Sequence, residues 1–569
     1  MHPIRARAAA VLLAVISAPG TAAAQTVTSS AGLVVSASAP ASDIGAAILA
    51  QGGNAVDAAI ATAFGLAVTY PGAGNIGGGG FMVVRMADGR TTTIDYRERA
   101  PGASAPTMYL DNAGNIDRAL TREGYLAPGV PGTVRGLEMA HRKFGKLPWK
   151  ALVEPAARLA RDGFPLSPAL ATELNWLVKQ TREHYPATAR AYGKPDGGEW
   201  SPGDVIRLPD LARTLAAIGN QGPDAFYRGW IADSVVAAMK AGGGIMTAKD
   251  LTDYRAVERA PVTGTFLGYD VIAMPPPSSG GTAIVEMLNI LERFDIASRD
   301  RFAPMTLHLM IEAQRRAYLD RAEFLGDADF GPVPVGRLTS KLHAKDLAAS
   351  IDTTGATSSV ALAKGRITVA EAPESEETTH FSVVDRDGNA VANTYTLESG
   401  YGSRVVVSGA GFLLNNEMGD FNKKPGTTNE LGDIGTKPNL IAPGKRMLSS
   451  MSPAIVTRNG KTVLVTGSPG GRTIINTVHQ IILNVLAFRM PVREAVDAPR
   501  FHSQWLPDLV SFEANAIPDA TVAALEAMGH QLRVGGRIGD GHSITIDPAT
   551  GIATGANDHR SPDSKASAP

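Results

Sequence analysis

Two adjacent threonines, Thr378 and Thr379, stand in the segment EETTHFSVVD at residues 376–385. A threonine hydroxyl can act as a nucleophile when a base takes its proton. At the start of a chain this base can be the residue's own α-amine, since a free α-amine has a pKa of about 7.7–8.0 and is partly neutral near pH 7. An internal threonine has an amide there, whose lone pair is delocalised. The pair also fits an ordinary strand start, because threonine is β-branched.

The segment before this pair bears on the choice between the two interpretations. From Leu347 to Glu377 the chain consists mainly of small and polar residues without sustained periodicity. This composition is typical of an exposed tether. A cut before Thr378 would create the missing amine, so the context makes Thr378 a candidate nucleophile.

Other familiar catalytic patterns are absent from the sequence. The glycines at 77–80 lack the Gly-Lys-Ser/Thr ending of a phosphate-binding loop, and we interpret them as a place of close backbone packing. The eleven histidines include no HExxH motif, so we expect His380 and His542 to be hydrogen-bonded structural residues and expect no metal site. The segment Gly467-Ser468-Pro469-Gly470 departs from the nucleophile elbow of serine hydrolases, and the chain has no cysteine.

Hydrophobic patterns predict the elements that would position the threonines. The segment HFSVVDRDGNAVANTYTL predicts a hairpin over 380–397 that turns at Asp387-Gly388. Before it we expect two packed helices over 41–69, a hairpin over 81–96, a mainly helical stretch over 107–260 and a helix at 282–294. After it we expect strands in 403–416, a hairpin over 452–468 and helices at 473–489 and 518–529. Strands and helices are grouped, which favours sheets covered by helices in layers.

Length, charge and the N-terminal segment limit the class of protein. Arg5 and Arg7, an apolar run from Ala8 to Ile16 and small residues up to Ala24 form the pattern of a secretory signal peptide cleaved after Ala24. Removal of residues 1–24 leaves 545 of the 569 residues, and we expect a soluble, periplasmic or secreted protein without a membrane span. With 54 Lys and Arg against 55 Asp and Glu and no charged block, a small molecule is a more plausible partner than nucleic acid.

Eight motifs make the sequence resemble the γ-glutamyltranspeptidase family of N-terminal-nucleophile hydrolases. They span nearly the whole mature chain: NAVDAAIATAFGLAVTYPGAGNIGGGGFM, DYRERAP, MPPPSSGG, ETTHFSVVDRDGNAVANTYTL, LLNNEMGDF, RMLSSMSPAIV, VTGSPGGR and APRFHSQWLP. The resemblance implies an α+β fold, a four-layer αββα sandwich, made as one precursor that cleaves itself between Glu377 and Thr378. A large subunit of residues 25–377 and a small catalytic subunit of residues 378–569 would then remain intertwined as a heterodimer.

The resemblance also implies roles for the reacting groups. Thr378 matches the family nucleophile, and Thr396 matches a second threonine whose hydroxyl would orient the nucleophile and assist processing. Gly470 and Gly471 in SPGGR match the glycines whose N–H groups would stabilise the charge that develops on the attacked carbonyl oxygen.

The substrate contacts implied by the family suit a γ-glutamyl group, which carries a free α-carboxylate and a free α-ammonium. Arg97 in DYRER matches the arginine that would bind the carboxylate, and Ser449 and Ser450 in LSSM would add hydroxyl donors. Glu417 and Asp420 in NNEMGD match the acids that would face the ammonium. A cation at one end of the site and anions at the other would bind both charged groups of the substrate.

Two positions depart from the family pattern. Glu398 in TLESGYG stands where many members have asparagine and others glutamate, and its charge would add attraction for the ammonium. The segment 425–435 resembles a lid found in some members, where a tyrosine closes over the substrate; this chain has Leu431 in that place.

The resemblance implies an exported γ-glutamyltransferase and glutathione hydrolase that needs no metal or organic cofactor. Thr378 would form a γ-glutamyl ester, which water or an amino-acid or dipeptide acceptor would resolve. One alternative keeps the fold and nucleophile but changes the acyl group, as in a cephalosporin (glutaryl) acylase or a poly-γ-glutamate hydrolase. Another alternative is a non-catalytic binding protein that stays uncleaved. The sequence does not give the acceptor or the ratio of hydrolysis to transfer.

Overall fold

The computed structural model describes residues 26–363, 377–428 and 435–569. The predicted signal peptide at 1–24 with its cut after Ala24, residues 364–376 of the predicted tether, and Leu431 in the lid-like segment lie outside these residues. Among the described residues, no helix has the length and apolar character needed to cross a membrane.

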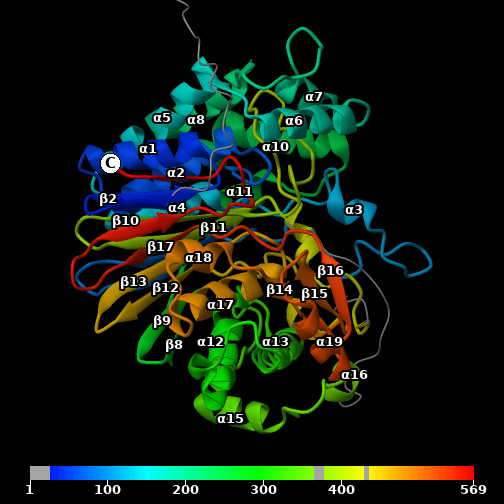
Figure 1. Cartoon of the computed structure of the whole chain (residues 1–569). Coiled ribbons are helices and arrows are strands. Elements are labelled where there is room, and N and C mark those ends of the chain that lie inside the picture. Colours follow the sequence, from blue (N-terminus) through cyan, green and yellow to red (C-terminus); the bar gives the residue numbers. More distant parts are fainter. Residues whose placement is uncertain (1–25, 364–376, 429–434) are drawn as a thin grey trace, which may run out of the picture.

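A seven-stranded antiparallel sheet carries the predicted threonine hairpin at its centre (Figure 1). Its order is β19 (Lys565–Ser567), β2 (Gly32–Ser36), β10 (Thr379–Asp385), β11 (Ala390–Thr396), β3 (Gly79–Arg85), β4 (Thr91–Asp95) and β7 (Val257–Arg259). Strands β10 and β11 pair with Thr379 opposite Tyr395, and each also pairs with a further strand on its other side. Both strands are buried along their whole length, as expected for the middle of a covered sheet.

A second seven-stranded antiparallel sheet packs against the first. Its order is β1 (Thr26–Ser29), β18 (Ala553–Ala556), β17 (Ser543–Ile546), β13 (Lys461–Thr466), β12 (Ala454–Arg458), β9 (Tyr269–Ala273) and β8 (Val262–Phe266). Aliphatic side chains from both sheets, including Leu33, Val83, Val384, Ile455 and Val465, form the core between them. Small and branched side chains at these positions allow the two sheets to approach closely.

Both sheets combine strands from the two sides of the Glu377–Thr378 bond. In the first sheet, β2 pairs with β10 and β19, and β3 pairs with β11. In the second, β1 pairs with β18 and β9 pairs with β12. Neither part of the chain therefore forms a complete sheet by itself.

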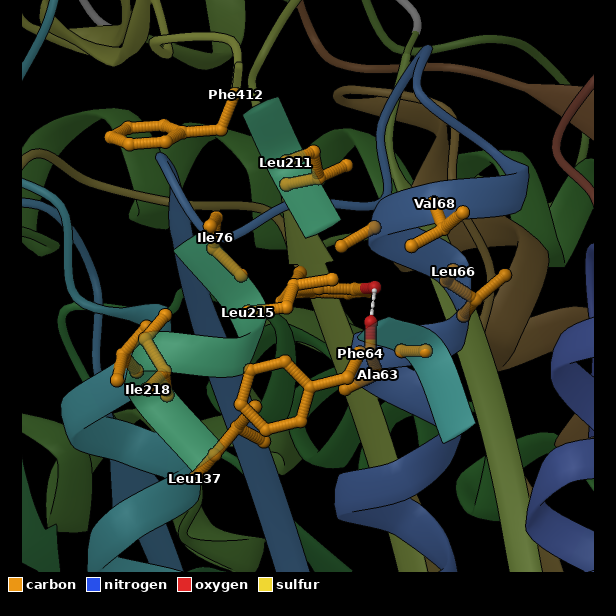
Figure 2. Packing of buried hydrophobic residues seen from close by; sticks show 14 of the residues in the cluster. Ala63, Phe64, Leu66, Val68, Ile76, Leu137, Leu211, Leu215, Ile218 and Phe412 are labelled. Atoms are coloured by element: carbon orange, nitrogen blue, oxygen red, sulfur yellow. Dashed lines mark hydrogen bonds between the residues drawn. The ribbon is translucent and has the colours of Figure 1, made fainter. Parts of the chain in front are cut away.

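Helices cover the outer face of the first sheet. They are α1 (Ala39–Ala50), α2 (Ala55–Thr69), α4 (Thr133–Phe144), α5 (Trp149–Asp162) and α8 (Pro209–Gln221). Helix α2 is buried on all sides, and Asn54 caps its N-terminus by accepting from the N–H groups of Val56 and Asp57 at 3.0 Å. Figure 2 shows Phe64 of α2 packed among Leu137 of α4 and Leu215 and Ile218 of α8.

Further elements extend this layer away from the sheet. They are α3 (Ala119–Arg122), β5 (Phe164–Pro165), α6 (Pro168–Thr181), α7 (Pro186–Tyr192), β6 (Val205–Ile206), α9 (Asp224–Tyr227), α10 (Gly229–Gly242) and α11 (Ala248–Asp253). The prediction that 107–260 is mainly helical is confirmed.

Helices also cover the second sheet, which completes the predicted αββα order (Figure 1). The main ones are α12 (Gly280–Leu291), α13 (Pro304–Phe324), α17 (Thr473–Leu486) and α18 (Val492–Asp497). Around them lie α14 (Val335–Leu338), α15 (Lys341–Ala349), α16 (Ser359–Leu362), β14 (Phe501–His502), β15 (Val510–Glu513), α19 (Asp519–Ala527) and β16 (Leu532–Gly535). The helices predicted near 282–294, 473–489 and 518–529 are confirmed within a few residues at each end.

Two local predictions are wrong. The segment 403–416 forms no regular strand: Gly409 and Gly411 have φ angles of 75° and 77°, and its two arms are joined by an isolated bridge between Val406 and Leu413 and a few backbone hydrogen bonds around it. The described start of the tether is not uniformly exposed either. Ser359 is fully buried, its N–H donates to Asp508 at 2.8 Å, and its carbonyl accepts from the Trp505 indole at 2.8 Å.

The glycines at 77–80 pack against backbone, as the sequence predicts. A Cβ added at Gly77 or Gly78 would lie 2.1 Å from a carbonyl oxygen of Leu413 or Thr396. A Cβ at Gly80 would lie 2.5 Å from the Thr394 carbonyl oxygen and 2.6 Å from the Tyr395 Cα. The glycines therefore let β3 and its approach lie directly against the threonine hairpin.

We expect Gly80→Ala to destabilise the fold by about 2–3 kcal/mol, because backbone of β11 would have to move to admit the methyl group. Gly72→Ala is the matched control, since Gly72 is also buried but a Cβ there meets nothing within 4 Å. Thermal unfolding should show a lower Tm for the first variant alone. Equal Tm values would contradict the proposed backbone contact.

Candidate active site

Thr378 lies directly before β10, 4% exposed, and its hydroxyl faces the preceding peptide group. The Oγ1 atom donates to the Glu377 carbonyl oxygen at 2.6 Å, and the Thr396 hydroxyl donates to the same oxygen at 3.1 Å. The two threonine Oγ1 atoms are 3.3 Å apart. Two hydroxyl donors thus polarise one carbonyl group, at the bond where cleavage is predicted.

The hairpin explains why these two threonines meet. Thr396 is the last residue of β11, and its hydroxyl is held by the N–H of Glu398, which donates to it at 2.8 Å. Thr379 is fully buried within the strand, and its own hydroxyl has no hydrogen-bond partner. Its side chain therefore points away from the group that Thr378 and Thr396 share.

A cavity opens at this end of the hairpin. It is lined by most of the residues that the sequence singles out, namely Arg97, Glu377, Thr378, Thr396, Glu398, Glu417, Asp420, Ser449, Ser450 and Gly471. Arg321, Asn439 and Arg472 also line it and were not predicted as site residues. Arg472 directly follows Gly471 in the SPGGR motif, which could have pointed to it, whereas Arg321 and Asn439 stand outside the quoted motifs and are brought here by the fold.

Arg97 is 1% exposed and is held by two carboxylates. One guanidinium nitrogen donates to Glu417 and the other to Asp420, while Glu98 lies 3.7 Å from the first. The guanidinium also donates to the carbonyl of Leu448 at 3.3 Å. Cation and anions are therefore in direct contact in the uncleaved chain, rather than at opposite ends of the cavity as the sequence analysis expects.

Three carboxyl groups, those of Glu98, Glu417 and Asp420, lie around the single guanidinium group of Arg97. Burial raises the pKa of Glu98 to about 7, and burial with the neighbouring acids raises the pKa of Glu417 well above its usual range, although Arg97 opposes both shifts. Among the described residues, no donor bonds to either oxygen of Glu98 or to Oε2 of Glu417. The direction of both pKa shifts favours a protonated carboxyl at this pair of acids.

Ser449 and Ser450 are held in place from the other side of the cavity. Ser279 donates to the Ser449 carbonyl through its N–H at 2.8 Å and its hydroxyl at 2.6 Å. Arg321 on α13 donates to the hydroxyls of Ser279 at 2.9 Å and Ser450 at 3.0 Å. The Pro-rich segment before α12 thus supports the serine pair, with Arg321 as the link.

Gly470 and Gly471 precede α17, where the positive end of the helix dipole lies. Their φ angles are 127° and 53°, which disfavour any side chain, and a Cβ at Gly470 would lie 2.5 Å from the Thr473 hydroxyl. Glu398 also has a positive φ of 84°, an unusual conformation for this residue type that places it on the cavity wall.

The two histidines expected to be structural differ. His380 is buried, and its ring contacts the hydroxyls of Thr394 at 2.8 Å and Ser382 at 3.1 Å, so the prediction is confirmed. Burial lowers its pKa well below the usual value and keeps it neutral. His542 is also buried, but among the described residues neither ring nitrogen has a hydrogen-bond partner, so the predicted hydrogen bonding of this histidine is wrong; its Nε2 lies 3.4 Å from Asp540 Oδ2.

Both the sequence and the structure are similar to those of known enzymes. The family profile described as gamma-glutamyltranspeptidase matches residues 41–568. The glutathione hydrolase proenzyme of Escherichia coli (strain K12) is 46% identical over 533 residues, which cover 94% of this chain and 91% of that protein. The structure of cephalosporin acylase from Bacillus halodurans is similar with a TM-score of 0.82 at 27% identity, covering 98% of this chain and 99% of that one. The γ-glutamyltranspeptidase structure from Helicobacter pylori has a TM-score of 0.55 at 41% identity, covering 56% of this chain and 91% of that one.

We expect Glu98→Gln to change how stability depends on pH. Folding raises the pKa of Glu98 from 4.5 to about 7, so the stability linked to its proton is complete below pH 4.5 and is lost as the pH rises through 7. The neutral amide avoids this loss. The variant should gain on the order of 2–3 kcal/mol relative to the parent between pH 5 and pH 8.

Thermal unfolding at several pH values measures this difference. Glu138→Gln is the control, because Glu138 is a partly exposed acid in an i,i+3 pair with Arg135. If the Tm of Glu98→Gln runs parallel to that of the parent over this range, Glu98 holds no proton.

Proposed function

Since this chain belongs to the γ-glutamyltranspeptidase family, we propose that it acts as a glutathione hydrolase and γ-glutamyltransferase with Thr378 as its nucleophile. The observation that carries the assignment is the position of the Thr378 hydroxyl, 2.6 Å from the Glu377 carbonyl oxygen and beside Thr396. The same cavity is lined by a buried arginine and by acids and hydroxyls that match the charged groups of a γ-glutamyl substrate.

The first reaction is proposed to be self-cleavage. The Thr378 Oγ1 attacks the Glu377 carbonyl carbon, the C–N bond breaks, and an ester replaces the amide. The proton lost by the hydroxyl passes to the nitrogen that becomes the α-amine. Water then hydrolyses the ester, which leaves a Glu377 carboxylate and a Thr378 with a free amine and a free hydroxyl. The products are a large subunit of residues 25–377 and a small subunit of residues 378–569, still joined through both sheets.

The second reaction uses the new amine as a general base. The amine takes the hydroxyl proton as Oγ1 attacks the γ-glutamyl carbonyl, and the N–H groups of Gly470 and Gly471 stabilise the oxyanion. The protonated amine then donates to the leaving amine, and a γ-glutamyl ester remains on Thr378. Water yields glutamate, whereas the amino group of an amino acid or dipeptide yields a new γ-glutamyl compound.

Recognition of the substrate requires a rearrangement of charge. The α-carboxylate would compete with Glu417 and Asp420 for Arg97, and the α-ammonium would take the place of the guanidinium as the partner of these acids. Ser449 and Ser450 would donate to the carboxylate, and Glu398 would add attraction for the ammonium. The γ-glutamyl head of the substrate carries one carboxylate and one ammonium, so it exchanges partners with Arg97 and the two acids without changing the net charge around them.

Export belongs to the same proposal. The signal-peptide pattern of residues 1–24 supports a periplasmic or secreted location, where extracellular glutathione and related γ-glutamyl compounds would be the substrates.

A second candidate activity is hydrolysis of glutaryl amides, as in a cephalosporin acylase. The similarity to the Bacillus halodurans acylase structure supports it. A glutaryl group has no α-ammonium, so it would leave Asp420 and Glu417 without a new cationic partner after it binds Arg97. This cost favours the γ-glutamyl substrate.

We expect the purified protein to give two bands on a denaturing gel, with the smaller beginning Thr-Thr-His. Thr378→Ala should remain one full-length band, because no hydroxyl can attack Glu377. Thr379→Val should still be cleaved, since the Thr379 hydroxyl is buried without a partner in β10. N-terminal sequencing checks the site, and cleavage of Thr378→Ala would exclude the proposed reaction.

We expect γ-glutamyl-p-nitroanilide to be cleaved with a higher kcat/KM than glutaryl-p-nitroanilide. Asp420→Asn should lower kcat/KM for the first at least tenfold, mainly through KM, and affect the second much less, because only the first carries the ammonium. Asp497→Asn, at a partly exposed ion pair with Arg493 outside the cavity, is the control. A preference for the glutaryl substrate would assign the acylase activity instead.

A further inference from the structure

Three helices of the layer that covers the second sheet bring two acids and a histidine together outside the active site. Glu286 on α12, Asp320 on α13 and His343 on α15 place one ligand atom each within 4.8 Å of the others. His343 Nε2 lies 2.7 Å from Asp320 Oδ2. The three residues are far apart in sequence, which is why histidine spacing alone predicted no metal site.

Glu286 is 1% exposed, and its Oε1 has no hydrogen-bond partner among the residues that the structure describes. Within the same residues, Thr282 Oγ1 and Asn289 Oδ1, one turn before and one turn after it on the same face of α12, are also buried oxygens without a partner. A buried oxygen without a partner costs free energy, and here three follow one face of a helix. This row of oxygens suits a metal cation, which accepts lone pairs from its ligands.

Two carboxyl groups meet at this junction, since ligand atoms of Glu286 and Asp320 lie within 4.8 Å of each other and of His343. Arg337 reaches over the ring of Phe324, with its guanidinium carbon 4.5 Å from the ring centre. Carboxylates this close repel each other unless a proton, a cationic side chain or a bound cation lies between them.

We propose that Glu286, Asp320 and His343 form a binding site for a divalent transition-metal cation, with Zn²⁺ as the best fit. An imidazole nitrogen and two carboxylate oxygens are typical Zn²⁺ ligands, whereas Ca²⁺ takes six to eight oxygen ligands. Bond lengths of about 2.0–2.2 Å place the donors of a tetrahedral Zn²⁺ site about 3.3–3.5 Å apart. The present separations, from 2.7 Å to within 4.8 Å, need only small side-chain movements to reach this value.

Such a site would fix α13 against α12 and α15 next to the active site. Asp320 is followed by Arg321, which donates to the hydroxyls of Ser279 and Ser450. The cation would act at this position as a structural clamp, without contact to the reacting groups. The site is independent of the proposed catalytic reaction.

The test uses the whole, untagged protein after removal of metal with a chelator. Zn²⁺ is added in about tenfold molar excess, and unbound metal is removed before elemental analysis and thermal unfolding. We expect one equivalent to be retained and the Tm to rise by several degrees. Glu286→Gln and His343→Gln should each weaken Zn²⁺ binding at least tenfold in a calorimetric titration.

His559→Gln is the matched control. His559 sits with Asp497 and Asp558 in a group of the same composition, but its side chain is half exposed and bonded to Asp497 at 2.8 Å. This variant should bind Zn²⁺ like the parent. Equal binding by the parent and by Glu286→Gln, or no binding by the parent, would overturn the site. In that case a higher Tm of metal-free Glu286→Gln would assign a shared proton to the two acids.

Discussion

The pairing of β10 with β11 in the middle of a covered sheet is the constraint on which the active site depends. It joins the ends of a hairpin so that two threonines, eighteen positions apart, share one carbonyl oxygen. A strand at a sheet edge would fray there, but these two are held on both sides by β2 and β3. The glycines of β3 then allow the backbone to pass directly behind the second threonine.

The second determinant is an excess of buried acid. Among the described residues, Arg97 is the cation that contacts Glu98, Glu417 and Asp420, and burial makes the ionisation of Glu98 and Glu417 costly. Such a group is stable only while it holds a proton or receives a cation. A γ-glutamyl head brings an ammonium together with a carboxylate, so it leaves this balance unchanged and gives the acids a cationic partner while its carboxylate engages Arg97.

Much of this organisation could be predicted from sequence. The hairpin of β10 and β11 follows from alternating residues around Asp387-Gly388, and the close packing at 77–80 follows from the lack of any phosphate-loop ending. The segment 403–416 was predicted wrongly, because its two short apolar runs, 405–407 and 412–414, suit strands but two glycines with positive φ between them fold the segment into a compact turn. Arg321 and the contact of Arg97 with both acids could not be predicted, since they depend on which helix ends and loops the sheets bring together.

The interleaving of strands has a consequence for the lifetime of the mature protein. Five strand pairs, β1 with β18, β2 with β10 and with β19, β3 with β11, and β9 with β12, join the parts on either side of Glu377–Thr378. The intact precursor can form these strand pairs within a single polypeptide chain, because the covalent connection keeps the two parts at a high effective concentration relative to each other. After cleavage, unfolded fragments would have to find each other by diffusion and interdigitate without that guide. The cleaved enzyme would then owe its persistence to a high unfolding barrier rather than to reversible folding.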